Sequence, residues 1–223
     1  MAAKQEANRP MQFTMNELDH ATRYKLLVNT VHPRPIAWVT TIDDQGRVNA
    51  APYSFFNAMG GTPPLLAIGI GSDTIRKGER EKDSLRNIRA AGEFTVSLVS
   101  HAQARAMVDT AAAAPSGEDE LAAAGLSTTP SSLVAPPLIA DAPVGYECRL
   151  WQYIETHPGG GIVLGEVLAT HIDDRFVGDE DGKLRIDAPA MDLVGRAHGS
   201  GWYWRGSDQL KLDRVDWPLP ERS

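Results

Sequence analysis

Residues 34–57, RPIAWVTTIDDQGRVNAAPYSFFN, have the pattern of a β-hairpin. The first half, residues 36–42, is rich in β-branched and aromatic residues, which suit a half-buried strand. The segment DDQG then supplies a turn in which Gly46 is free to adopt a positive φ. The return strand, residues 47–56, contains Pro52, which has no N–H and therefore indicates an edge strand or a bulge. Small residues, hydroxyls and flanking aromatics here suit a flat ligand with polar edges, and an ordinary core hairpin is the alternative.

Short apolar segments bounded by glycine and proline recur along the rest of the chain. We expect further strands over residues 65–70, 92–99, 144–156, 162–172 and 184–186, and loops over 60–64 and 157–161. Helical spacing of apolar residues predicts helices over residues 16–28, 101–114 and 118–124, the first capped by Thr14 or Asn16. This pattern predicts a mainly β protein, an antiparallel barrel with peripheral α-helices.

The length and composition fit one domain over residues 1–223, with loosely ordered or dimer-contacting tails at 1–12 and about 207–223. A net charge of −7 argues against a broad phosphate-binding surface, so no nucleic acid partner is expected. No apolar run approaches the roughly 20 residues of a membrane span, and the first residues lack the apolar core of a signal peptide. The single cysteine, Cys148, fits a reducing compartment. We expect a cytoplasmic protein without membrane contact.

The only locally basic region is residues 73–89. Six lysines and arginines outnumber the acidic residues there, and Asp83 or Ser84 is a suitable cap for a short helix. Amide groups at a helix start, the positive end of the helix dipole and a lysine together suit a phosphate group. A solvated charged helix face is the alternative.

Three motifs, taken in order, resemble the flavin reductase-like, FMN-binding split-barrel family. They are RPIAWVTT at residues 34–41, GRVNAAPYSFFN at 46–57 and KDSLRNI at 82–88, with a weaker fourth, IVLGEV, at 162–167. The resemblance implies a six-stranded Greek-key split β-barrel that works as a homodimer, with the flavin near the subunit interface.

The resemblance also implies which residues bind the cofactor. Along the isoalloxazine ring it places Thr40, Thr41, Asn49, Ala50 and Ala51, with Trp38 packed on or near the ring. Toward the ribityl chain and phosphate it places Ser54, Phe55, Asn57, Lys82, Asp83 and Ser84. Core packing is the alternative for Trp38 and Phe55.

The six histidines form no H-x-H or H-E-x-x-H set, so no metal site is expected. His157 lies close to where some members of the resembling family place a histidine that faces the nicotinamide, and it is the one candidate catalytic-side residue. His198, followed by Gly199 and Gly201, is a second histidine near the expected pocket, and a hydrogen-bonded structural histidine is the alternative.

The resemblance implies an FMN-binding oxidoreductase that transfers hydride from NADH or NADPH to flavin, with FAD as the alternative flavin. In such a reaction the cofactors carry the chemistry, so no dedicated acid, base or nucleophile is required. Three alternatives stay open. They are an FMN-binding electron carrier without an efficient nicotinamide site, a split-barrel flavin oxidase or oxygenase, and a structural barrel with a degenerate pocket.

Overall fold

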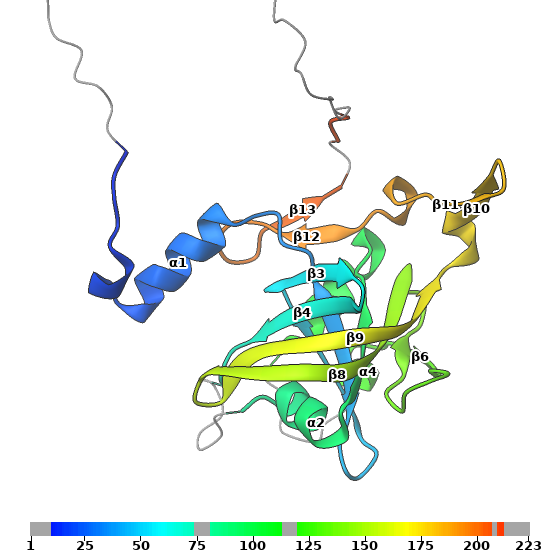
Figure 1. Cartoon of the computed structure of the whole chain (residues 1–223), viewed down its shortest axis with the longest axis horizontal. Helices are drawn as coiled ribbons and strands as arrows, with labels where there is room; N and C mark the ends of the chain where they lie inside the picture. The colour runs from blue at the N-terminus through cyan, green and yellow to red at the C-terminus, as the bar shows by residue number, and fades with distance from the viewer. Residues whose placement is uncertain (1–9, 74–80, 113–119, 207–208, 212–223) are drawn as a thin grey trace, which may run out of the picture.

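The computed structural model describes residues 10–73, 81–112, 120–206 and 209–211 (Figure 1). The expectations for the tails, residues 1–12 and about 207–223, fall almost wholly outside these residues, as do three arginines and lysines of the basic region, Arg76, Lys77 and Arg80.

The hairpin predicted from residues 34–57 forms. Strand β1 (Ala37–Ile42) pairs antiparallel with β2 (Val48–Tyr53), with Thr40 opposite Ala50. Gly46 adopts a φ of 76° in the turn, as predicted. Strand β2 pairs with β1 alone and is therefore an edge strand, which explains why it tolerates Pro52.

Seven strands form one sheet in the order β2-β1-β5-β8-β9-β4-β3. The other five strands of this sheet are β3 (Phe56–Gly61), β4 (Pro64–Ile70), β5 (Glu93–Ser97), β8 (Val144–His157) and β9 (Gly160–Ile172). The edge strands β2 and β3 follow each other in the chain and are separated only by Ser54 and Phe55. Such a short link forces the sheet to curl until its two edges meet, and all neighbouring strands pair antiparallel. The mainly β, antiparallel barrel is confirmed (Figure 1).

Two expectations about this region were wrong. The return strand ends at Tyr53, and the loop expected over residues 60–64 is reduced to a two-residue turn at Thr62 and Pro63. Instead, the chain bends at Ser54 and Phe55 and starts a second edge strand, β3, which includes both glycines of the expected loop. The bend is held by Gly69 of β4, whose amide donates a hydrogen bond of 2.7 Å to the Phe55 carbonyl. A Cβ on residue 69 would lie 3.0 Å from the Phe55 Cβ, a tight contact that favours glycine at this close approach.

The helices lie around the barrel. They are α1 (His20–Thr30), α2 (Asp83–Ala91), α3 (Ala104–Asp109) and α4 (Glu120–Ala123). Helix α1 starts later than predicted because Asp19, rather than Thr14 or Asn16, accepts the capping hydrogen bond, 2.9 Å from the Thr22 amide. Single 3-10 turns occur at Met15–Glu17, His101–Gln103, Asp174–Phe176 and Pro189–Met191. In the described ranges, no helix is long and apolar enough to cross a membrane.

Three small two-stranded sheets complete the described structure. They are β6 (Thr128–Thr129) with β7 (Leu138–Ile139), β10 (Val177–Glu180) with β11 (Lys183–Ile186), and β12 (Val194–Arg196) with β13 (Tyr203–Arg205). The long β8–β9 hairpin turns at Pro158 and Gly159, so the expected five-residue loop over 157–161 is a two-residue turn.

Strand β1 is buried on both faces, which explains its unbroken apolar character. Ala37 and Val39 join a cluster inside the curled sheet, together with Phe94 and with Leu85 and Ile88 from α2. The opposite face of β1 joins a second cluster, which includes Trp38, Ala50, Val99, Met107 and Leu121. Helix α2 thus covers the inner cluster, while α3 and α4 cover the outer one.

A buried carboxylate, Glu147 of β8, holds the proline-flanked segment 131–135 against the barrel. It accepts hydrogen bonds from the amides of Ser132, Leu133 and Val134, and His171 lies 2.6 Å away. Burial alone would raise the pKa of Glu147. The hydrogen bonds from Ser132, Leu133 and His171 outweigh burial and lower this pKa from 4.5 to about 2.

We expect the free energy of unfolding to fall as the pH decreases from about 4.5 to about 2. The unfolded chain protonates this carboxyl near pH 4.5, whereas the folded protein keeps it charged to about pH 2, so its stabilisation is complete only above the higher value. The loss amounts to a few kcal/mol, since one pKa unit corresponds to about 1.4 kcal/mol.

Urea denaturation at pH 7 and pH 3 measures this effect. Glu147→Gln should be less stable than the wild type at pH 7 and should lose less stability on acidification. Glu180→Gln, at an exposed position of β10, serves as the control and should follow the wild type at both pH values. Equal acid sensitivity of Glu147→Gln and the wild type would contradict this assignment.

Candidate functional site

A groove of about 510 Å³ runs between α1 and the barrel. Its barrel side consists of the β2–β3 link and the end of β4, and its ends are the start of α2 and the tip of the β8–β9 hairpin. Four residues predicted from the sequence line it: Ser54, Phe55, Lys82 and His157.

One end of the groove is polar and carries a cation. Lys82 is the N-cap residue of α2, and its ammonium lies 5.5 Å from the centre of the Tyr53 ring. The hydroxyls of Ser54 and Ser72 lie on the same groove, and the Ser72 hydroxyl donates to the Pro158 carbonyl over 3.0 Å. A lysine at the start of a nine-residue helix suits an anionic group, because the helix dipole and the ammonium act in the same direction.

The other part of the groove is aromatic. Phe55 is 44% exposed, and the Tyr24 ring of α1 lies 6.0 Å from it at an angle of 52°. The Arg34 guanidinium also lies 5.9 Å from the Phe55 ring centre. At the hairpin tip, His157 Nδ1 lies 3.0 Å from the Thr156 hydroxyl. The groove therefore combines a flat apolar surface with a basic polar end.

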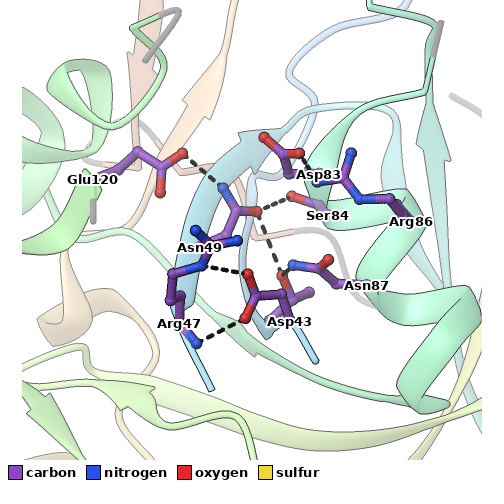
Figure 2. A network of polar contacts seen from close by, with 9 residues as sticks. Asp43, Arg47, Asn49, Asp83, Ser84, Arg86, Asn87 and Glu120 are labelled. Carbon is purple, nitrogen blue, oxygen red and sulfur yellow. Dashed lines mark hydrogen bonds and ion pairs between the residues drawn. The ribbon is translucent and has the colours of Figure 1, made fainter. Parts of the chain in front are cut away.

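Several predicted cofactor residues belong instead to a polar network between four elements (Figure 2). Asn49 of β2 is at its centre: its amide nitrogen donates to Glu120 of α4 over 2.7 Å, and its carbonyl oxygen accepts from the Ser84 hydroxyl of α2 over 2.8 Å. Thr41 of β1 contacts the same carbonyl oxygen at 3.4 Å and accepts from Asn87 at 3.1 Å. These side chains satisfy one another and do not line the groove.

Glu120 is the charged member of this network. Its second carboxylate oxygen accepts a hydrogen bond from the Ala50 amide over 3.2 Å. Burial raises the pKa of Glu120, although the hydrogen bonds from Ala50 and Asn49 act in the opposite direction. The network thus fixes α4 and α2 on β2. Asn49, Thr41, Ser84 and Ala50 have a structural role that the motif alone did not indicate.

The remaining predicted residues also lie away from the groove. Trp38 is fully buried in the outer cluster, and its indole N–H donates to the Thr110 hydroxyl over 2.9 Å. In this structure its side chain is therefore part of the core. Thr40 is fully buried, and Ala51 packs against the inner cluster. Asn57 is exposed on β3 and bonds the next amide in the chain, while Asp83 pairs with Arg86.

The groove residues that were not predicted include His20 and Tyr24 of α1. Tyr24 counted in the sequence only as one of the apolar residues with helical spacing, and it is 53% exposed. The signal available was the spacing of two ring side chains by four residues, which places them on one helix face. Among the described residues, no three His, Cys, Asp or Glu side chains gather as metal ligands would.

Comparison with known proteins identifies relatives of the whole described fold. The family model "Flavin reductase like domain" matches residues 29–186. An uncharacterised protein of Deinococcus radiodurans is 42% identical over 207 residues, covering 91% of this chain and 89% of that protein.

Two solved structures are similar as well. The 2-nitrobenzoate 2-nitroreductase NbaA of Pseudomonas fluorescens superimposes with a TM-score of 0.82 at 33% identity, covering 95% of this chain and 99% of the other. A Shewanella frigidimarina protein, named for flavin reductase and a split barrel domain, gives a TM-score of 0.75 at 25% identity, covering 92% and 100%.

We expect Asn49→Ala to destabilise the protein by roughly 1–3 kcal/mol, because Glu120 and the buried Ser84 lose their half-buried hydrogen-bond partner. Ser54→Ala, in the groove, should change stability by no more than about 0.5 kcal/mol. Urea denaturation of the two variants measures the difference. An unchanged urea midpoint for Asn49→Ala would show that the network contributes nothing to the fold.

Proposed function

This chain belongs to the flavin reductase-like family, and from that premise we propose that it binds FMN in the groove beside Lys82 and transfers hydride from NADH or NADPH to it. The split-barrel fold and the flavin-related oxidoreductase class follow from the family. The choice of FMN over FAD and the use of a nicotinamide are the proposed part.

The observation that carries the proposal is that one groove is lined both by an exposed aromatic ring, Phe55, and by a lysine at a helix start, Lys82. FMN is a flat ring system joined through a ribityl chain to a phosphate, and it needs an apolar surface at one end and cationic help at the other. The Phe55 ring provides the first, and Lys82 at the start of α2 provides the second. A volume of about 510 Å³ lies within the usual range for a small-molecule site.

The residues of the groove act by binding and orientation. Lys82 neutralises the phosphate, the Ser54 hydroxyl bonds the phosphate or the ribityl chain, and Phe55 packs against the ring. When bound, the flavin supplies a hydride acceptor and a store for two electrons. His157 at the hairpin tip is the candidate for contact with the nicotinamide.

A second candidate activity is electron transfer to a nitro-substituted aromatic acid. The observation that favours it is the pair of accessible rings, Tyr24 and Phe55, beside basic side chains in the same groove. The structural relative NbaA bears the name of such a reductase.

An absorbance spectrum of the purified protein, before and after anaerobic NADH and then NADPH, tests the proposed function. Flavin bands that bleach within the turnover time support a reductase and identify its donor. Bands that persist would favour the electron carrier. No bands, even after FMN is added, would overturn the proposal.

We expect Lys82→Ala to weaken FMN binding by about 10- to 100-fold, which corresponds to roughly 1–3 kcal/mol for a hydrogen bond to a charged group. Titration of FMN fluorescence measures the dissociation constant. Lys183→Ala, on the exposed hairpin strand β11, is the matched control and should bind FMN as the wild type does. An equal dissociation constant for both variants would remove Lys82 from the site.

We also propose that the protein is a homodimer. Its support is three exposed large apolar side chains on β8 and β9: Trp151 is 53% exposed, and Ile154 and Ile162, which lie opposite each other, are 42% and 37% exposed. Association of two chains would bury such apolar side chains. Light scattering should give twice the chain mass, and a monomer that still binds FMN tightly would contradict the proposal.

A further inference from the structure

We propose that α1 is the outer wall of the groove, and that Tyr24 and His20 determine specificity for the second substrate, a planar aromatic molecule carrying negative charge. The inference rests on the proposed function, because it concerns the molecule that exchanges hydride with the flavin. Three features of the structure support this role of α1: its attachment to the barrel, the position of its side chains and the charge of the groove.

Helix α1 is fixed to the barrel at its C-terminal end by Arg34, which is only 6% exposed. One guanidinium nitrogen donates to the carbonyls of Val28 and Val31 over 2.9 and 2.6 Å, and the other donates to Ala197 over 3.4 Å. A cation at the last carbonyls of a helix also complements its dipole. The direction of α1 is therefore set by a buried anchor.

The rest of α1 stands out from the barrel (Figure 1). Of its eleven residues, only Val28 is buried. The Tyr24 ring nevertheless contacts Phe55 on the barrel side, and the His20 ring stacks on Tyr24 at 6.5 Å and 17°. Both rings line the groove, and about half of the Tyr24 side chain is still accessible. They present a flat surface opposite the β2–β3 link.

This arrangement determines where a second molecule lies. The proposed flavin-binding residues Ser54, Phe55 and Lys82 all belong to the barrel side or to the start of α2. Hydride transfer requires donor and acceptor to be held face to face. The second substrate therefore lies on the α1 side of the groove, which Tyr24 and His20 line.

The charge of the groove indicates the class of substrate. Among the described residues that line it, none is Asp or Glu, whereas Lys82 carries a positive charge. The chain as a whole carries a net charge of −7, so the charge of this groove is a local exception that favours anions. A dinucleotide phosphate and an aromatic carboxylate share this chemistry, together with a flat ring that packs on Tyr24.

Steady-state kinetics of Tyr24→Ala test the inference. With NADH as donor, KM should rise about tenfold, as expected for the loss of one ring contact, while the FMN dissociation constant stays within twofold of the wild type. Tyr24→Phe should restore the wild-type KM. The control is Leu27→Ala, since Leu27 lies on the same helix, is 48% exposed and is not among the described groove residues. It should leave KM unchanged.

Competitive inhibition by benzoate distinguishes the two classes of anionic substrate, a nicotinamide dinucleotide and an aromatic acid. A raised KM for NADH with unchanged benzoate inhibition supports a nicotinamide dinucleotide, and weaker inhibition by benzoate supports an aromatic acid. A weaker FMN affinity of Tyr24→Ala with unchanged KM would overturn the inference, because Tyr24 would then belong to the flavin site. Unchanged values throughout would overturn it too. A wild-type protein that binds no FMN would overturn both the proposed function and this inference.

Discussion

The two-residue link between β2 and β3 is the constraint on which the rest of the structure depends. Ser54 and Phe55 join strands that occupy opposite edges of a seven-stranded sheet, so the sheet cannot remain open. The same link sets the place of the groove, because the chain turns there with Phe55 half-exposed and its carbonyl bound to Gly69. Barrel closure and the candidate site are thus consequences of one local feature.

The sequence predicts the parts of the fold that depend on local chemistry. The hairpin turn at Gly46, the edge position of Pro52 and the long strands β8 and β9 follow from turn residues and from alternating or apolar runs. Strand β3 was missed because its two glycines are typical of loops. They fit in a strand here since β3 is an exposed edge that packs few side chains.

The structure brings only part of the predicted cofactor residues to one groove, and the reason is physical. The motif residue Asn49 has a side chain that can bond a ligand or a protein group with equal ease. Its actual partner, Glu120, lies 71 positions away in the chain, and no local pattern specifies that contact. Lys82 and Ser54 depend on backbone geometry next to them, a helix start and a strand link, and their place on the groove follows from features that the sequence shows.

Glu147 has a consequence for which substitutions the segment 131–135 can accept. The carboxylate binds amide groups of the main chain at positions 132, 133 and 134, together with the Ser132 hydroxyl. The order of the segment therefore depends mainly on N–H groups rather than on particular side chains. Most replacements at position 133, where Leu133 is exposed, retain the donor, whereas proline removes it. Prolines stand at 130, 136 and 137, on both sides of these three positions, and at none of them. A buried charge in the barrel thus allows sequence drift in the surface segment that it holds.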